Sequence, residues 1–517
     1  MGRLADIAVL GSGAVGAAIA EVAARAGHPV RLFDIRPEAA TRAVDRLGRS
    51  LARDVARGLL EAGEAGATVG RVSVVPSLQD LAGVTVVVEA VVEDAAVKRE
   101  LLGEVEKVVT QAGDDALLAT ATSTLSVTAL ATALQRPGRL VGLHVVAPTS
   151  HLPLIEVVRG LASRPEVVEA AVELVRAWGK TPVQCRATPG LVVDRVSRPF
   201  FGEAERIVEA RGADPATVDA VLREAGGFPA GPFELADTVG QEVTMAVTRS
   251  VWERTFHDPR YAPTGFQQDL VDSGRTGRRS GRGVYTWSPD GEALDAAPLT
   301  APPREAPLRV QLVDYDFGPM APFLDRIERA GVRIERISLS DSEALEELPG
   351  LRLPGDGLLR VTDGSTARSW AMEAPGGVVL LDWAHDPARC RRVALMAPRD
   401  IDPVVLDAAI GLCQAAGVQV SVIADVAGGI IARTVSMLVN EAVDLVARGD
   451  ASATDVDVAM LLGTGYPSGP LEWGDRIGAV RVASVLAELH EECPTGRYRL
   501  SPRLDEAVVA EENLRDL

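Results

Sequence analysis

The chain contains one sequence pattern twice, at an offset of 238 residues. The segment GLVVDRVSRPFFGEA, which begins at Gly190, returns as GGIIARTVSMLVNEA, and the turn GFPAGP further on returns as GYPSGP. Arg195 pairs with Arg433 and Glu203 pairs with Glu441 in this alignment. The stretch before the second copy also resembles the stretch before the first. A chain of 517 residues with such a repeat predicts two units, each an α/β part followed by a helical part.

A glycine-rich turn lies between a strand-like apolar run and a helix-like segment near the N-terminus. The run DIAVL is followed by GSGAVG, in which Gly11, Gly13 and Gly16 occupy the glycine positions of G-x-G-x-x-G. These glycines allow a tight turn, close approach of a pyrophosphate, and packing of helix on strand. Asp34 ends the next strand-like run, where an acid binds ribose hydroxyls and repels a 2′-phosphate. The pattern predicts a Rossmann-type doubly wound domain that binds NAD rather than NADP, a preference that Arg36 weakens slightly. An ordinary βαβ turn without ligand is the alternative.

Charge and cysteine content narrow the choice of partners. The formal net charge is −19, from 72 acidic and 53 basic residues, which argues against nucleic acid or an anionic membrane surface as the main partner. The four cysteines are widely spaced and form no C-x-x-C pair, so we expect neither a disulfide framework nor a thiolate metal site. Glycines interrupt the first apolar stretch, so we expect no signal peptide or membrane span, and we expect a cytoplasmic protein.

Several motifs in combination resemble the 3-hydroxyacyl-CoA dehydrogenase family, in its two-module bacterial form. They are GSGAVGAAIAEVAARAGHPVRLFDI, VVVEAVVEDAAVKRELL, TATSTLSVTAL, VGLHVVAPTSHLPLIEVV, TPGLVVDRVSRPFFGEA and TGRRSGRGVYTW. The resemblance covers nearly the whole chain and is weakest at about residues 290–390. It implies an α/β plus all-α protein with four parts: an NAD-binding Rossmann domain (1–186), a helical C-terminal domain for substrate and dimerisation (187–290), a degenerate α/β segment (305–423) and a second helical C-terminal domain (424–517).

The resemblance also implies a reaction and a catalytic pair. In this family NAD oxidises an L-3-hydroxyacyl-CoA to the 3-ketoacyl-CoA, here with a substrate of the 3-hydroxyadipyl-CoA type from phenylacetate or fatty acid β-oxidation. His144 matches the general base and Glu156 matches the carboxylate that orients it. Imidazole titrates near neutrality and so accepts a hydroxyl proton, while a carboxylate on the other ring nitrogen fixes the tautomer. A core histidine at a strand end and an exposed glutamate are the alternatives.

Further residues match positions that contact cofactor or substrate in the family. Glu93 and Lys98 match positions beside the nicotinamide ribose, and Ser123 matches a serine that contacts the substrate hydroxyl and the cofactor. Ser50 and Arg57 fall on a helical arm that holds the CoA phosphates and pantetheine. Lys98, one of only three lysines, and Arg57 are also candidate donors to the anionic ligands. The alternatives are a solvated helix start for Glu93 and Lys98, a helix cap for Ser123, and a solvated helix face for the other two. No metal is implied.

Three asparagines of the family pattern are missing. Ala121 stands in T-A-T-S where the family has S-N-T-S, Ala147 stands in HVVAP for HFFNP, and Asp194 stands in GLVVDR for GFIVNR. An active-site hydrogen-bond donor is typically worth about 10²–10³ in rate, and a carboxylate such as Asp194 repels a developing oxyanion unless it is protonated or paired. The leading prediction is an NAD-dependent 3-hydroxyacyl-CoA dehydrogenase. The alternatives are a dehydrogenase for another 3-hydroxy acid or acyl-carrier substrate, and a catalytically weak NAD-binding homologue.

Repeated helical modules offer matching surfaces to each other. We therefore expect residues 424–517 to pack against the first helical module as an internal counterpart of the subunit contact of the family. The chain would then be a monomer with pseudo-dimeric helical modules, although a homo-oligomer stays possible on the sequence alone.

Overall fold

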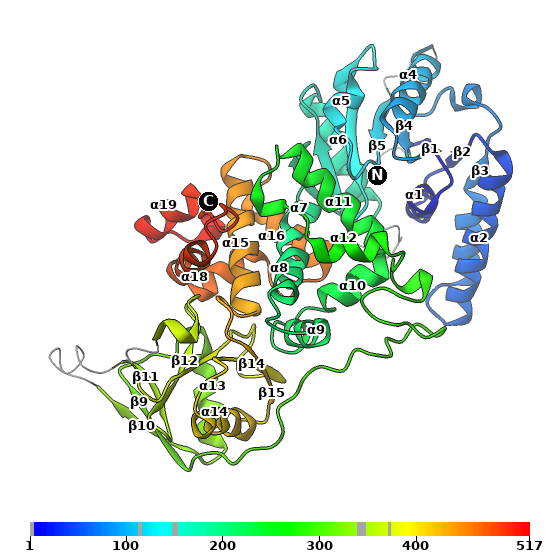
Figure 1. Cartoon of the computed structure of the whole chain (residues 1–517). Coiled ribbons are helices and arrows are strands. Elements are labelled where there is room, and N and C mark those ends of the chain that lie inside the picture. The colour runs from blue at the N-terminus through cyan, green and yellow to red at the C-terminus, as the bar shows by residue number, and fades with distance from the viewer. Residues whose placement is uncertain (1–4, 112–115, 147–152, 339–347, 371–373) are drawn as a thin grey trace. The chain divides into compact units, whose positions relative to one another are not determined.

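The computed structural model divides the chain into two compact units, which Figure 1 shows as ribbons. The first unit is Met1–Val193 with Arg448–Thr464, and the second is Asp194–Ala447 with Gly465–Leu517. The structure describes residues 5–111, 116–146, 153–338, 348–370 and 374–517. The expected fold class, a Rossmann domain with a helical domain and a partial second copy, is confirmed. The four domain boundaries stay predictions.

The first unit is built on an eight-stranded sheet with the order β3-β2-β1-β4-β5-β6-β7-β8. All neighbouring strands are parallel except β6 and β7, which are antiparallel. Strands β1, β4 and β5 are buried along their whole length, as is usual for a sheet covered on both faces. The strand bounds are Ile7–Leu10 (β1), Val30–Phe33 (β2), Val72–Val74 (β3), Val86–Glu89 (β4), Leu117–Thr120 (β5), Leu140–His144 (β6), Leu154–Arg159 (β7) and Thr181–Arg186 (β8).

Strand order reverses between β1 and β4, so the carboxyl ends of these strands form the switch point at which such sheets bind nucleotides. The helix after β2 is amphipathic and buries Ala40, Ala43, Leu47 and Leu51 on one face. The helices of this unit are Ala14–Arg25 (α1), Pro37–Ala56 (α2), Ala62–Gly70 (α3), Ala95–Gln111 (α4), Val127–Ala131 (α5), Pro165–Ala177 (α6) and Ala453–Thr464 (α16).

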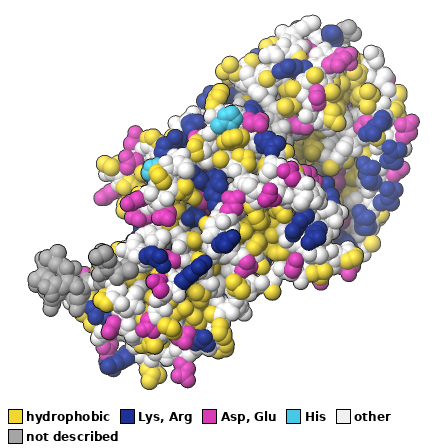
Figure 2. All heavy atoms as spheres, viewed as in Figure 1, with side chains coloured by type: hydrophobic (Ala, Val, Ile, Leu, Met, Phe, Trp, Pro, Cys, Tyr) yellow, Lys and Arg dark blue, Asp and Glu magenta, His cyan; other side chains and the backbone are white. Residues whose placement is uncertain are grey.

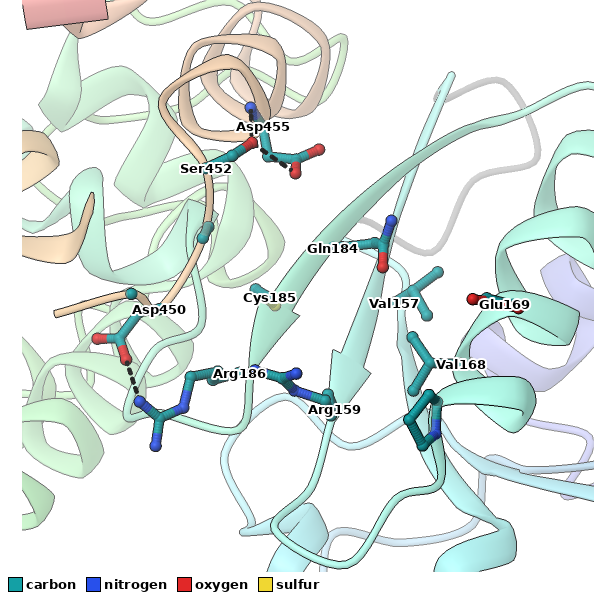
Figure 3. Close-up of a pocket in the computed structure, with 13 residues that line it drawn as sticks. Val157, Arg159, Val168, Glu169, Gln184, Cys185, Arg186, Asp450, Ser452 and Asp455 are labelled. Carbon is teal, nitrogen blue, oxygen red and sulfur yellow. Dashed lines mark hydrogen bonds and ion pairs between the residues drawn. The ribbon is translucent and has the colours of Figure 1, made fainter. Parts of the chain in front are cut away.

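A short segment from the second half of the chain completes the first unit. Ala451 forms an antiparallel bridge with Cys185 at the end of β8, and the backbone N–H of Arg186 donates to the carbonyl of Asp450 at 2.7 Å. Helix α16 then packs beside β7 and β8. Figure 3 shows the resulting pocket of about 350 Å³, with Arg159 on the sheet side and Asp450 on the inserted segment. His144 and Glu156 do not line this pocket.

The second unit contains a seven-stranded mixed sheet with the order β10-β9-β11-β12-β13-β14-β15. Strands β9 and β10 with the helix between them keep the βαβ pattern, but DYDFGPM stands where the first unit has its glycine turn. Phe317 and Met320 of that loop are fully buried. The strand bounds are Arg309–Val313 (β9), Arg333–Ile337 (β10), Gly350–Leu353 (β11), Gly357–Val361 (β12), Val378–Leu381 (β13), Arg392–Ala397 (β14) and Gln419–Ala424 (β15).

Both helical modules of the repeat contribute to the second unit, where α8 packs against α15. Arg195 pairs with Glu441 at 2.5 Å, and the equivalent Arg433 approaches Glu203 at 3.8 Å, so the two ion pairs are reciprocal. Tyr261 donates to Glu441 as Tyr498 donates to Glu203. The helix bounds are Val193–Val196 (α7, which begins in the first unit), Arg198–Glu209 (α8), Pro215–Glu224 (α9), Pro232–Val239 (α10), Gln241–Arg254 (α11), Gly265–Asp272 (α12), Ala321–Arg329 (α13), Pro403–Ala415 (α14), Ile431–Ala447 (α15), Pro470–Ile477 (α17), Ala479–Glu492 (α18) and Pro502–Ala510 (α19). Among all the helices described, none has the length and apolar character needed to cross a membrane.

Candidate active site

The glycine turn has the geometry that its spacing predicts. Gly11 has a φ of +101°, and a Cβ there would lie 2.5 Å from the carbonyl oxygen of Ala90. A Cβ on Gly16 would lie 2.0 Å from the carbonyl oxygen of Gly11. Gly13, the N-cap of α1, has open space on its Cβ side. Two of the glycines are therefore required by packing, and the third leaves the helix N-terminus open to a phosphate.

Asp34 follows β2 and is held beside this turn. The backbone N–H and the hydroxyl of Ser12 donate to Asp34 Oδ2 at 2.9 and 2.6 Å, and the backbone N–H of Arg36 donates to Oδ1 at 3.0 Å. Burial raises the pKa of Asp34, but the hydrogen bonds from Ser12 and Arg36 outweigh it and hold the pKa below its ordinary value. The carboxylate is therefore charged near neutral pH, as acceptance of ribose hydroxyls requires.

We expect Asp34→Ser to remove the preference for NAD over NADP. The Asp34 carboxylate favours NAD by repelling the 2′-phosphate of NADP. Its removal should lower the ratio of the dissociation constant of NADP to that of NAD by about 100-fold, because close like charges cost several kcal/mol. Titration calorimetry with both cofactors measures that ratio. The exposed Glu38 in the first turn of α2 provides the control, since Glu38→Ser should leave the ratio unchanged. An unchanged ratio in Asp34→Ser would contradict the assignment.

A buried ion pair lies at the carboxyl ends of β4 and β5. Lys98 is 1% exposed, and its Nζ donates to Glu89 Oε1 at 2.7 Å and lies 3.3 Å from Glu93 Oε2. Thr120 donates to the other Glu89 oxygen at 2.7 Å. Two carboxylates contact the ammonium group of Lys98, and the expectation that Lys98 binds an anionic ligand stays a prediction. The sequence analysis did not single out Glu89 and Thr120. The pattern that could have indicated them is a glutamate and a threonine at the ends of adjacent buried strands.

Glu93 holds the loop that follows β5. Its Oε1 accepts hydrogen bonds from the hydroxyl of Thr122 and from the backbone N–H groups of Ser123 and Thr124. Burial raises the pKa of Glu93, but these bonds and Lys98 together lower it below its ordinary value. Ser126, and not Ser123, caps the following helix α5, so the alternative of a helix cap does not apply to Ser123.

His144 and Glu156 form a buried pair across two strands. They are direct partners in the antiparallel pairing of β6 and β7, and His144 Nδ1 lies 2.5 Å from Glu156 Oε2. Both side chains are almost fully buried, so the alternative of an exposed glutamate is wrong. The second carboxylate oxygen, Oε1, accepts the backbone N–H groups of Val192 at 2.9 Å and Val193 at 3.2 Å. Glu156 therefore orients the imidazole and also anchors the segment that leads into the helical module.

The second copy keeps this anchor and lacks the base. Ala394 stands at the repeat position of Glu156, and the residue opposite it on the neighbouring strand is Asp382. The Asp382 carboxylate accepts the backbone N–H groups of Ile430, Ile431 and Ala432, of which the first two are the repeat equivalents of Val192 and Val193. One carboxylate thus replaces the histidine–glutamate pair, and the second copy has no histidine at the repeat position of His144.

The helical arm presents arginines on its exposed face. Five of them recur at helical spacing along α2 and its C-cap: Arg42, Arg46, Arg49, Arg53 and Arg57. All are exposed, and none has a carboxylate oxygen within 4.0 Å in the part of the chain that the structure describes. Figure 2 shows basic side chains gathered over α2 on this face. Ser50 is half-buried on the same helix.

Two of the three positions at which the family has an asparagine lie within the described residues. Ala121 is half-buried after β5, and its backbone N–H donates to the carbonyl of Glu89 at 2.7 Å. Asp194 is in α7 and begins the second unit, and its carbonyl accepts from Arg198. Ala147 lies outside the described residues.

A dinucleotide turn, an acid after β2 and a buried histidine–glutamate pair define a nicotinamide-dependent dehydrogenase. Comparison with known families agrees. The NAD binding domain of 3-hydroxyacyl-CoA dehydrogenase matches residues 6–188, and its C-terminal domain matches residues 190–287 and 428–516. The reduced Rossmann-fold domain of 3-hydroxybutyryl-CoA dehydrogenase matches residues 359–426. The chain belongs to the 3-hydroxyacyl-CoA dehydrogenase family.

Some relatives match this chain over nearly its whole length, and others match about half of it. The 3-hydroxyadipyl-CoA dehydrogenase of Escherichia coli K12 is 38% identical over 506 residues, which is 98% of either chain. A crystal structure titled 3-hydroxybutyryl-CoA dehydrogenase from Escherichia coli K12 has a TM-score of 0.86 and 36% identity, and it covers 98% of this chain and 99% of that chain. The 3-hydroxybutyryl-CoA dehydrogenase of Mycobacterium tuberculosis H37Rv is 36% identical over 282 residues, or 54% of this chain and 98% of that protein. The chain is an NAD-dependent 3-hydroxyacyl-CoA dehydrogenase of the long, two-module form.

Proposed function

We propose that the chain oxidises a 3-hydroxydicarboxylyl-CoA of the 3-hydroxyadipyl-CoA type to its 3-keto product, with His144 as the general base. The observation that carries the catalytic assignment is the 2.5 Å contact between His144 Nδ1 and Glu156 Oε2 inside the first unit. The two-module relative from Escherichia coli that carries the name 3-hydroxyadipyl-CoA dehydrogenase supports the substrate class.

The proton moves to the ring nitrogen that does not face Glu156. Nδ1 of His144 is hydrogen-bonded to Glu156, so Nε2 is the nitrogen that takes the C3 hydroxyl proton. As the proton leaves, the C3–H bond breaks and the C3–O bond becomes a carbonyl. Glu156 stabilises the imidazolium that forms, and its position is fixed by Val192 and Val193. NAD, when bound, would supply the acceptor for the hydride of C3. The residues for it are the turn at Gly11–Gly16, Asp34, and the loop that Glu93 and Lys98 hold, which includes Ser123.

The absence of the three asparagines affects the expected rate of the reaction and not the type of reaction. Ala121 cannot supply the side-chain donor that the family has at this place, and each lost donor is worth about 10²–10³ in rate. A catalytically weak homologue is therefore the second candidate. Ala121→Asn distinguishes the two: a gain in turnover supports a dehydrogenase slowed by the loss, and no gain favours a protein that has given up catalysis.

The arginine-bearing face of α2 is the proposed site for the CoA phosphates. CoA is a polyanion, and this acidic protein needs a local cluster of cations to bind it. We expect the double variant Arg53→Glu and Arg57→Glu to raise KM for a CoA thioester at least about tenfold, with a smaller change in kcat. The same variant should leave KM unchanged for the matching pantetheine thioester, which lacks those phosphates. An equal effect on both thioesters would contradict a CoA site here, and wild-type activity on the pantetheine form alone would favour an acyl-carrier substrate.

The remaining assignments concern assembly and location. The reciprocal pairs Arg195–Glu441 and Arg433–Glu203 support a monomer in which the two helical modules substitute for a subunit contact. All four cysteines are free thiols, which is typical of a reducing compartment, and we assign the protein to the cytoplasm. Degradation of phenylacetate or β-oxidation is the setting that fits the substrate class.

A further inference from the structure

Three charged side chains meet at the carboxyl ends of β4 and β5 in the first unit. Lys98 Nζ donates to Glu89 Oε1 at 2.7 Å and lies 3.3 Å from Glu93 Oε2. The side chains of Lys98 and Glu89 are 1% and 0% exposed, whereas that of Glu93 is 35% exposed. We call these three residues the β4 charge cluster. Its ion pair is buried, and one of its carboxylates reaches the surface.

The β4 charge cluster contains more negative than positive charge. Neither carboxylate has a second cation within 4.0 Å among the described residues. The two oxygens of Glu89 also accept the backbone N–H of Val91 at 2.8 Å and the hydroxyl of Thr120 at 2.7 Å, as suits a carboxylate. Burial raises the pKa of Glu93, but its hydrogen bonds and Lys98 outweigh burial and hold the pKa below its ordinary value. Two carboxylates against one ammonium group leave one negative charge uncompensated.

Strand order places the β4 charge cluster on the nicotinamide side of the cofactor site. Asp34, after β2, suits the adenosine ribose, and the glycine turn after β1 suits the pyrophosphate. Strands β4 and β5 lie on the side of β1 opposite to β2, as Figure 1 shows. A dinucleotide whose adenosine half lies at β2 therefore extends its nicotinamide half toward β4 and β5. His144, the proposed general base, ends β6, which is the next strand in the sheet.

The two redox states of the cofactor differ in charge at this end of the molecule. The nicotinamide ring of NAD is positively charged, and the ring of NADH is neutral because a hydride has been added to it. We propose that the β4 charge cluster favours oxidised over reduced nicotinamide, because its excess negative charge attracts the positive ring. Glu89 contributes charge from within the sheet, and Glu93 presents charge at the surface. This preference favours the release of NADH after hydride transfer.

The test measures the binding of both cofactor forms to the full chain in the absence of substrate. Calorimetric titration gives the dissociation constants of NAD and NADH for wild type and for Glu89→Gln. The glutamine carbonyl can still accept from Lys98 and Val91, and its NH₂ group can donate to Thr120. The substitution therefore removes the charge and keeps the contacts. We expect the ratio of the dissociation constant of NADH to that of NAD to fall by about tenfold, since a charge near the ring is lost.

Three further measurements separate the charge from a structural role. Thr120→Val removes a hydrogen bond to Glu89 but no charge, so it should leave the ratio within about twofold of wild type. ADP-ribose lacks the nicotinamide ring, and its affinity for Glu89→Gln should also stay within about twofold of wild type. Lys98→Met removes the positive charge of the cluster and should raise the ratio.

The result does not depend on which thioester the enzyme oxidises. A ratio in Glu89→Gln equal to that of wild type overturns the proposal, as does an equal loss of affinity for NAD, NADH and ADP-ribose. In either case the cluster only supports the fold of the site. A ratio that changes as much in Thr120→Val as in Glu89→Gln also overturns it. If Glu89→Gln does not fold, Glu93→Gln decides by the same ratio, since it also removes one negative charge.

Discussion

His144→Gln should lower kcat for oxidation of an L-3-hydroxyacyl-CoA by about 10³–10⁴-fold and leave NAD affinity within about threefold of wild type. General-base catalysis by a positioned side chain contributes about 10²–10⁴ in rate, and Glu156 holds His144, the proposed general base, in a fixed orientation. Glutamine fills a similar volume but cannot take a proton near neutral pH. Initial rates of NADH formation and calorimetric titration with NAD measure the two effects.

His28 supplies the matched control for this substitution. It is a buried histidine of the same unit, and the hydrogen bonds of its ring among the described residues are with the backbone of Ala5. His28→Gln should therefore alter stability without lowering kcat more than about threefold. Equal kcat values for wild type and His144→Gln would show that another group removes the proton.

Glu156→Gln should lower kcat by a comparable factor while the fold stays intact. The Gln carbonyl can still accept the N–H groups of Val192 and Val193, which turns its NH₂ group toward His144 Nδ1. Nδ1 must then accept instead of donate, so the ring proton moves to Nε2, where it blocks proton uptake from the substrate. In serine proteases the equivalent change from Asp to Asn costs about 10⁴ in kcat for this reason. Steady-state kinetics and thermal unfolding of the same preparation measure the two properties.

Two further variants separate the anchoring role of Glu156 from its catalytic role. Glu156→Ala removes both sets of contacts and leaves buried N–H donors without partners, so we expect a loss of stability of roughly 2–4 kcal/mol in addition to the loss of kcat. Asp382→Asn alters the equivalent anchor of the second copy, which has no histidine opposite. It should lower the melting temperature and leave kcat nearly unchanged. A kcat for Glu156→Gln like that of Asp382→Asn would reduce Glu156 to a purely structural residue.

The sequence predicted best those features that short-range patterns encode. The turn at Gly11–Gly16 and Asp34 depend on local spacing, and the structure shows them together as expected. His144 and Glu156 are twelve residues apart on adjacent strands, so the quoted motif contained both. The reciprocal contacts of α8 and α15 could be anticipated because a repeat implies matching surfaces.

Features that depend on long-range packing could not be predicted in this way. The pairing of Lys98 with Glu89 depends on two buried strand ends, and from sequence alone a lysine at a helix start is typical of a solvated face. The return of residues 448–464 to the first unit depends on a bridge between Cys185 and Ala451, which no local pattern records.

The most direct test of the account is the initial rate of NADH formation by the purified full chain with NAD and a panel of L-3-hydroxyacyl-CoA thioesters. We expect turnover that depends on His144, is highest with a dicarboxylyl thioester, and is lost when NADP replaces NAD. A protein that binds NAD and turns over no thioester of any chain length would contradict it.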